Sequence, residues 1–151
     1  MKVYKSMIEN KASVVLLKRP GEIRVEQISL DPLKENDLLV ENFFSGISSG
    51  TERLLFEGRM PTFPGMGYPL VPGYECFGKI LDCSETSGYE VGETVFVPGA
   101  TCYGDVKGLF GGASSHLVVD KDRVIRMPFE MGRNNVLLAL AATAHHIFEG
   151  N

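Results

Sequence analysis

The chain has 151 residues, 44% hydrophobic and 23% charged, which suits one globular domain with a real core. Its net charge of -4, with scattered basic residues, argues against nucleic acid or an anionic membrane as a partner. The longest nearly apolar run, Val136 to Phe148, is shorter than the roughly 20 residues that cross a bilayer. Met1 to Lys11 is polar and charged and forms no apolar signal core, so a cytoplasmic protein without a transmembrane segment is expected.

Short apolar or alternating runs separated by turn signals predict a series of strands. The runs cover residues 13–17, 22–28, 37–44, 75–83, 94–97, 115–119 and 124–126. Glu22 to Ile28 alternates apolar and polar residues, which is typical of a half-buried strand, and Pro20-Gly21 before it marks a hairpin turn. Many short strands with few helices predict a mainly β fold, as a closed or partly open β-barrel.

Two helices are predicted. Ser49-x-x-Glu52 matches a capping box, in which the serine oxygen accepts from the backbone N–H of Glu52 and the glutamate reaches back. Gly58 is a natural C-terminal stop for this helix. Capping alone would explain Ser49 and Glu52, so it stands beside a catalytic role for them. Apolar residues at helical spacing predict the second helix from Asn134 to Phe148.

The three cysteines contain no Cys-x-x-Cys pair, and their odd number argues against a disulfide framework or a structural zinc site. Cys76 and Cys83 fall in a strand-like run and are expected to behave as small buried hydrophobes. Cys102 lies in a glycine-rich loop and is the thiol with the best chance of touching a site.

A series of motifs occurs in the order found in one enzyme family. They are Gly46-Ile47-x-x-Gly50-Thr51-Glu52, residues 69–75 (PLVPGYE), 78–80 (GKI), 89–96 (YEVGETVF) and 114–124 (SxxLVVDxxRV). Together they cover nearly the whole chain and resemble the GroES-like catalytic domain of the medium-chain, zinc-type alcohol dehydrogenases. The resemblance implies a GroES-like, partly open β-barrel over residues 1–133. It implies that residues 134–151 begin the helical connection to a Rossmann domain.

No Gly-x-Gly-x-x-Gly follows a strand in this chain, so the dinucleotide fingerprint of that Rossmann domain is missing. The chain is therefore interpreted as the catalytic half of a longer enzyme. By itself it is expected to be inactive and to bind NAD weakly or not at all. The apolar stripe of its second helix would lack a cover, and self-association through that stripe is expected.

Longer segments resemble the branch of the family that serves bacteriochlorophyll synthesis. They are residues 50–55, 58–61, 63–75, 97–104, 108–113 and 138–144. This resemblance implies that NAD oxidises the hydroxyethyl group of a chlorin pigment to acetyl. Three alternatives remain open: a zinc-free alcohol dehydrogenase acting on another substrate, a quinone-reductase-like enzyme, and a non-catalytic barrel that binds a small molecule.

The resemblance also places three residues where the family carries its zinc ligands. Ser49 (or Ser48, because the turn has one extra residue), Tyr74 and Ala139 stand at these positions. This set cannot form a tetrahedral zinc site, so no zinc is expected and the alcohol proton must leave through a side chain. Tyr74, Glu52 and Glu75 are the candidates, in that order, with Ser49 beside them.

Other roles follow from the resemblance. Glu75 has an alternative role, because the family's glutamate at this position supports the residues of the active site without touching the substrate itself. Thr143 matches the position that faces the nicotinamide. At most one of its neighbours His145 and His146 is functional, because adjacent residues on a helix face different ways. His116, in a strand, is more often a packing residue.

The candidates for binding a flat, apolar pigment are basic and aromatic residues. Arg53 and Arg59 are candidates to pair with its carboxylate, although a solvated helix end explains them too. Tyr68, Tyr103 and Phe110 offer ring faces, as do Phe43, Phe44 and Phe63 with the soft side chains of Met60 and Met66. Packing in the core or in loops is the alternative for most of them.

Overall fold

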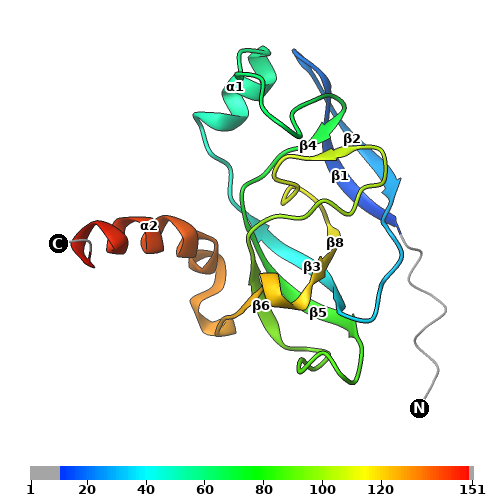
Figure 1. The fold of residues 1–151 in the computed structure, drawn as a ribbon, viewed down its shortest axis with the longest axis vertical. Coiled ribbons are helices and arrows are strands. Elements are labelled where there is room, and N and C mark those ends of the chain that lie inside the picture. The colour runs from blue at the N-terminus through cyan, green and yellow to red at the C-terminus, as the bar shows by residue number, and fades with distance from the viewer. Residues whose placement is uncertain (1–10, 150–151) are drawn as a thin grey trace.

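A computed structural model describes residues 11–149 (Figure 1). Residues 1–10 and 150–151 lie outside the described part, and so do the expectations for the N-terminus, for the beginning of the first predicted domain and for the end of the second. The strands are β1 (Lys11–Arg19), β2 (Glu22–Ser29), β3 (Asp37–Ser45), β4 (Leu70–Val71), β5 (Cys76–Cys83), β6 (Thr94–Val97), β7 (Lys107–Gly108), β8 (His116–Asp120) and β9 (Ile125–Arg126). The helices are α1 (Thr51–Glu57), η1 (Lys121–Arg123), η2 (Phe129–Leu137) and α2 (Leu138–Glu149).

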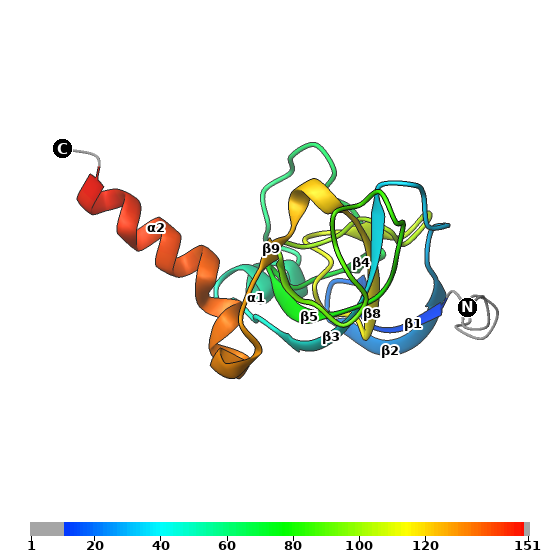
Figure 2. The same cartoon turned by 90° about the horizontal axis from the view of Figure 1, so that it is seen from below.

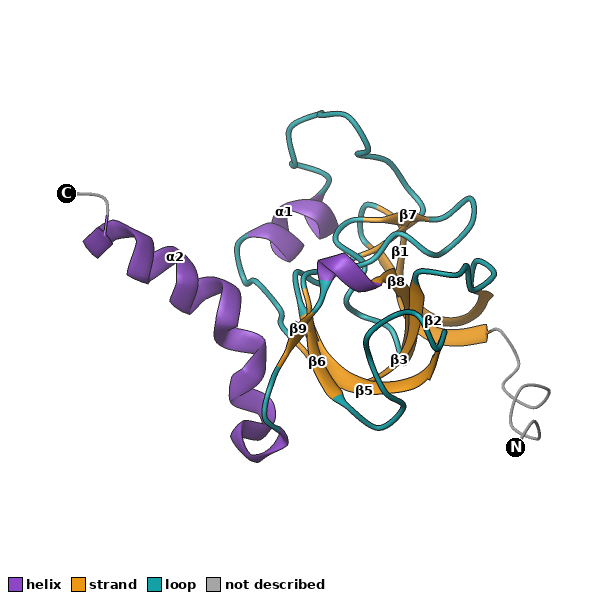
Figure 3. Cartoon of the chain, turned by 60° about the horizontal axis from the view of Figure 1, so that its bottom comes forward, coloured by secondary structure: helices purple, strands orange, loops and turns teal. Residues whose placement is uncertain are grey.

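The strands form two sheets that curve around one core (Figure 3). One sheet has the order β2-β1-β4-β7 and the other β8-β3-β5-β6-β9, and every pairing is antiparallel except that of β4 with β7. The backbone of residues 113–115 joins the sheets, because Val15 N–H donates to Ala113 at 2.9 Å and Ser115 N–H donates to Ser13 at 2.8 Å. The described strands do not close into a full barrel, and the partly open form of the prediction is confirmed.

The predicted strand runs all lie on observed strands, but two short strands were missed. β4 and β7 lie in segments rich in proline and glycine, and they exist because β4 pairs with Leu17 of β1 and with β7. Such pairing between distant segments leaves no periodic pattern within two residues. The expectation that β2 is half-buried also needs correction, because the apolar side chains of Ile23 and Val25 face outward and are exposed.

Helix α1 begins differently from the predicted capping box. Gly50 is its N-cap residue, and no side chain caps the helix there. The backbone N–H of Glu52 donates to the carbonyl of Ser48 at 3.1 Å, so it is not available to the Ser49 hydroxyl. The capping box is therefore wrong. The stop at Gly58 is confirmed: this glycine is left-handed (φ 69°), and its N–H donates to the carbonyl of Leu55 at 3.2 Å.

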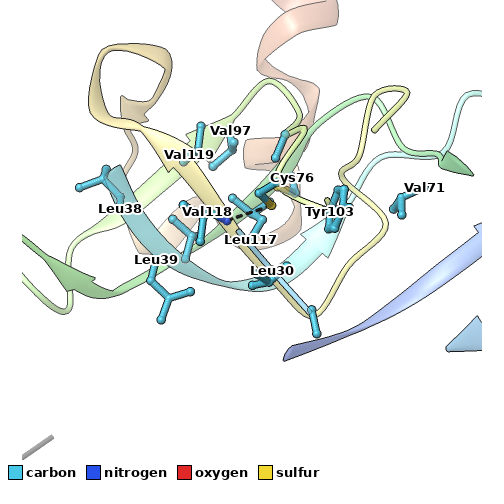
Figure 4. Close-up of a cluster of buried hydrophobic side chains, with 14 of the residues drawn as sticks. Leu30, Leu38, Leu39, Val71, Cys76, Val97, Tyr103, Leu117, Val118 and Val119 are labelled. Carbon is cyan, nitrogen blue, oxygen red and sulfur yellow. Dashed lines mark hydrogen bonds between the residues drawn. The ribbon is translucent and has the colours of Figure 1, made fainter. Parts of the chain in front are cut away.

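Two groups of buried side chains hold the fold together. The larger one lies between the sheets and includes Leu38, Val97 and Leu117 (Figure 4). Each such fully buried aliphatic side chain contributes roughly 1.5–3 kcal/mol to the free energy of unfolding. The smaller group, under α1, consists of Leu17, Leu55, Leu70 and Leu109, with Met60, Met66 and Tyr68 packed against it. It fixes α1 and the proline-rich loop after it to the first sheet.

The cysteines lie in or beside the larger group. Cys76 and Cys102 are buried, and Cys83 is half-buried. The Cys102 sulfur accepts a hydrogen bond from the backbone N–H of Val118 at 3.2 Å. Cys102 thus belongs to the core rather than to a surface loop, and it has the role expected of the other two thiols.

The C-terminal segment turns away from the sheets. The predicted helix from Asn134 begins later, because residues 134–137 belong to the 3-10 segment η2 and α2 starts at Leu138. The amide of the buried Asn135 donates to the carbonyl of Pro128 at 2.9 Å and holds η2 in this conformation. α2 then extends away from both sheets (Figures 1 and 2), with Leu140 and Phe148 exposed. Among the described residues, no helix is long and apolar enough to cross a membrane.

Candidate active site

The loop before β5 brings Tyr74 to the start of helix α1. Gly73 has a left-handed backbone (φ 99°), and a Cβ atom there would lie 2.6 Å from the backbone nitrogen of Ala113, so the turn requires glycine. The Tyr74 hydroxyl lies 3.0 Å from Oγ1 of Thr51. Its ring lies 4.4 Å from the ring of Phe110, centroid to centroid, and Phe110 is partly exposed. The fold therefore assembles Tyr74, Thr51 and Phe110 from three distant segments.

Glu52 and Glu75 form a pair of carboxyl groups beside this loop. Glu52 is half-buried, and its Oε2 is buried without a hydrogen-bond partner among the described residues. Burial raises the pKa of Glu52 above its ordinary value. Glu75 is only 8% exposed, and its pKa is raised by burial and then by the negative charge of Glu52. The two groups thus interact, and both hold a proton more tightly than a solvated glutamate.

Gly46 makes room for the Glu75 carboxyl. A Cβ atom at this position would lie 2.5 Å from Oε1 of Glu75, which is closer than real contacts allow. The backbone N–H of Gly46 also donates to the backbone carbonyl of Glu75 at 2.8 Å. The Gly46 turn therefore fixes Glu75 through its backbone and leaves space for its side chain.

Glu52 lies on the wall of an apolar cleft of about 380 Å³. The cleft runs between the β1–β2 hairpin, the segment after β3 and the loop before β8. Its described lining residues are Ser13, Val14, Val15, Leu17, Ile23, Val25, Ser45, Ile47, Glu52, Pro72, Gly73, Ala113, Ser114 and Ser115. Glu52 is the one ionisable residue in this set, and Tyr74 is not part of it. The sequence analysis missed this cleft; the outward-facing apolar residues of β2 were its one available signal.

A second hollow, a groove of about 670 Å³, lies on the other sheet. It is lined by Phe43, Lys79, Gly92, Glu93, Thr94, Arg126, Met127, Pro128 and Phe129. Its charges are paired: Arg126 Nε lies 2.8 Å from Glu93, and Lys79 Nζ lies 3.3 Å from Glu41 and 5.6 Å from the centre of the Phe43 ring. Phe43 also packs edge-on against Phe129. Phe43 therefore belongs to this groove and not to the apolar cleft.

The residues at the positions of the family's zinc ligands do not form a cluster of His, Cys, Asp or Glu side chains in the described part of the chain. Ser49 is exposed, the Tyr74 hydroxyl is paired with Thr51, and Ala139 has no donor atom. Within residues 11–149, no three His, Cys, Asp or Glu side chains are grouped as a metal would need. Burial raises the pKa of Cys76 to about 12 and that of Cys102 to about 11, as is typical of thiols in an apolar core.

The predicted pigment-binding residues lie in different environments. Arg53 and Arg59 are exposed and both pair with Glu57, at 2.8 and 2.9 Å. Tyr68 packs in the small core group and donates its hydroxyl hydrogen to the carbonyl of Leu55. Tyr103 is buried in the larger core group and donates to the carbonyl of Gly111, so a surface ligand does not reach it and the expectation for Tyr103 is corrected to packing.

The remaining candidates are less closely grouped. Phe44 and Phe63 are partly exposed, and no described contact joins them to Glu52. Thr143 is exposed on α2, where its hydroxyl donates to the carbonyl of Ala139 at 2.9 Å. His145 and His146 are exposed on the same helix, which extends away from the sheets (Figure 1). Nδ1 of His116 lies 3.0 Å from the Ser115 hydroxyl, as suits a packing residue on β8.

Residues 34–129 match the model of the alcohol dehydrogenase GroES-like domain, and the chain belongs to this family. It is 48% identical over 138 residues to a 2-desacetyl-2-hydroxyethyl bacteriochlorophyllide A dehydrogenase of Rhodobacter capsulatus, covering 91% of this chain and 44% of that protein. It is 42% identical over 145 residues to an enzyme of the same name from Cereibacter sphaeroides, covering 93% of this chain and 46% of that protein. The chain thus spans a little under half the length of these curated relatives.

The fold is also that of solved dehydrogenases. An alcohol dehydrogenase of Escherichia coli, solved in complex with NADH, superimposes with a TM-score of 0.66 at 22% identity. The match covers 85% of this chain and 42% of that one. At this level of identity the likeness concerns the fold, which is therefore the mainly β, GroES-like fold that the motifs predict.

Proposed function

We propose that this chain is the catalytic part of a dehydrogenase that oxidises the hydroxyethyl group of bacteriochlorophyllide a to acetyl. The observation that carries the proposal is the identity of 48% over 138 residues to an enzyme named for this substrate. Two contacts support a polar site on the family's frame: Tyr74 lies against Thr51, and the Glu75 carboxyl is close enough to be affected by the charge of Glu52, which lines an apolar cleft. A site of this kind suits a large apolar substrate that carries one reacting hydroxyl group.

The proposed oxidant is NAD, as in the NADH-bound neighbour with this fold. When bound, NAD accepts a hydride from the carbon that carries the hydroxyl group. Thr143 is our candidate for contact with the nicotinamide edge. The sequence holds no dinucleotide fingerprint, so the adenosine and pyrophosphate would bind a further part of the protein, corresponding to the rest of the relatives' length. We therefore expect the 151 residues alone to oxidise no alcohol.

The residues of this chain must handle the proton. Ser49, Tyr74 and Ala139 supply no zinc ligand set, so the hydroxyl proton passes to a side chain of the chain itself. The apolar walls of the cleft would exclude water from the reacting hydroxyl group. Arg53 and Arg59 remain candidates to bind the pigment's carboxylate. Both guanidinium groups also pair with Glu57.

The test is a fusion of this chain to the C-terminal part of the Rhodobacter capsulatus relative, called the fusion enzyme below. Supplied with NAD and hydroxyethyl bacteriochlorophyllide a, it should change the pigment's absorbance as hydroxyethyl becomes acetyl. Ethanol and butanol serve as comparison substrates. Oxidation of these small alcohols together with inactivity on the pigment would overturn the proposed substrate.

Elemental analysis of the fusion enzyme tests the zinc-free part of the proposal. We expect far less than one zinc per chain after purification without chelator. Turnover should also be unaffected by a strong chelator. Stoichiometric zinc that is needed for turnover would contradict this part and leave the substrate assignment standing.

A further inference from the structure

The rim of the cleft beside Glu52 is unusually apolar for an exposed surface. Ile23 is 55% exposed, Val25 75% and Ile47 81%, and all three line the same cleft. They come from strand β2 and from the segment after β3, so the fold brings together apolar residues that are distant in sequence. Exposed apolar side chains gathered around one hollow mark a binding site for an apolar partner more often than scattered ones do.

The wall of the cleft carries a single acidic group, Glu52, whose carboxyl also receives backbone hydrogen bonds from Ser48 and Gly73. Oε2 of Glu52 is buried without a hydrogen-bond partner among the described residues. Buried polar atoms are nearly always paired in folded proteins, so an exception calls for an explanation. Glu52 is also the one ionisable residue among the described lining residues, and is thus the side chain of the cleft that can take a proton from a ligand hydroxyl.

We propose that Glu52 is the base that takes the proton from the substrate hydroxyl, and that this cleft receives the edge of the pigment ring that carries the hydroxyethyl group. The inference rests on the proposed function and adds where the substrate lies and which group reacts. The O–H proton moves to the Glu52 carboxylate, the C–H hydride moves to NAD, and the C–O single bond becomes a carbonyl. Water then takes the proton from Glu52, which restores the carboxylate.

The geometry favours Glu52 over the other two candidates. Tyr74 does not line the cleft, and its hydroxyl already lies 3.0 Å from Oγ1 of Thr51. Glu75 is nearly fully buried and also lies outside the lining set. Its role is that of a neighbouring carboxyl group, whose pKa the charge of Glu52 raises. The raised pKa of Glu52 lies closer to neutral pH than the pKa of a solvated glutamate. A general base is most effective when its pKa lies near the working pH.

The size of the cleft limits what enters it. A volume of about 380 Å³ accepts one edge of a macrocycle rather than the whole ring. The rest of the flat ring would lie over the exposed side chains of Ile23, Val25 and Ile47. A charge placed on this rim should therefore weaken pigment binding without touching the reacting group.

The first test is Glu52→Gln in the fusion enzyme, which keeps the shape of the side chain and removes the base. Turnover of the pigment should fall about 100-fold or more, the usual size of a lost general base. Pigment affinity should stay within about threefold of the parent, and circular dichroism should show an unchanged fold. A Glu52→Gln enzyme that turns over at the parent rate would overturn the assignment of the base.

The second test addresses the cleft, with Val25→Asp and the matched control Val91→Asp. Val91 is 63% exposed, similar to Val25, and is not a lining residue of the cleft. Val25→Asp should weaken pigment binding at least about tenfold, the loss expected for one buried apolar side chain. Val91→Asp should leave it unchanged. Equal pigment binding by Val25→Asp and the parent would overturn the location of the substrate.

The two levels of the proposal fail separately. A parent fusion enzyme that does not oxidise the pigment refutes the proposed function. An active parent whose Glu52→Gln and Val25→Asp variants behave as the parent refutes only this further inference.

Discussion

The groove beside Phe43 and the cleft beside Glu52 differ in size and, more importantly, in how their charged groups are paired. The groove beside Phe43 is the larger, at about 670 Å³, but its charged groups are paired, Arg126 with Glu93 and Lys79 with Glu41. The cleft beside Glu52 is smaller, at about 380 Å³, and is almost wholly apolar. Its one carboxyl group has a buried oxygen without a partner among the described residues.

The difference teaches where to look for chemistry. Paired charges in an open groove are satisfied by each other and by water, and such pairs contribute little to stability and nothing to reactivity. A carboxyl group against apolar walls holds its proton more tightly than a solvated one, and Glu52 lines a space that a substrate can enter. Unsatisfied groups, rather than volume, therefore distinguish the candidate active site from the groove.

Tyr74→Phe sharpens the comparison within the site. This change removes the hydroxyl that faces Thr51 but keeps the ring against Phe110. If Glu52 is the base, turnover by the fusion enzyme should fall less than about tenfold, well below the loss of a general base. Steady-state rates with the pigment provide the measurement. A loss of about 100-fold would make Tyr74 the proton relay instead, which is the order that the sequence first favoured.

Arg126→Ala tests the groove. It removes the ion pair with Glu93 and the stacking of the guanidinium on Tyr89, where the charge lies 4.0 Å from the ring centre. Because these contacts are exposed, the free energy of unfolding should fall by less than about 1 kcal/mol. Turnover should stay as in the parent. Denaturant unfolding and steady-state rates check both points, and a large loss of turnover would move the active site toward the groove.

The difference in stability between the parent and Glu52→Gln should depend on pH. The native pKa of Glu52 is raised, so the native state keeps this proton to a higher pH than the unfolded chain does. The parent therefore loses stability as pH rises from the ordinary glutamate range through the raised native pKa, and the glutamine variant lacks this loss. Melting temperatures of the two should diverge in favour of Glu52→Gln as pH rises above the ordinary glutamate range. A constant difference over this range would show that Glu52 titrates normally.

Much of the fold was predictable because it depends on local patterns. The strand runs from Ser13 to Arg126 carry apolar residues at strand spacing, and Pro20-Gly21 and Gly58 mark the turn and the helix end that the structure has. The two-residue strands β4 and β7 were not predictable, since their pairing is set by distant segments. The capping box failed because the carbonyl of Ser48 pairs with the N–H that the box required.

The candidate site was predictable only in part. Tyr74, Glu52 and Glu75 lie in motifs that the family resemblance singles out, and the fold brings Glu52 close to Glu75 and Tyr74 close to Thr51. The apolar cleft depends instead on packing between segments as distant as Val25, Ile47 and Ser114. Tyr103 was misplaced for a similar reason, because a glycine-rich loop that suggests exposure folds its ring into the core.

The most direct test of the account is the pH dependence of kcat for the fusion enzyme and its Glu52→Gln variant. In the parent, kcat should fall as pH drops through the raised pKa of Glu52, because the protonated carboxyl cannot accept the hydroxyl proton. The variant should be slow throughout and show no such fall. An acid limb of the same shape and position in both enzymes would contradict the central claim, since another group would then take the proton.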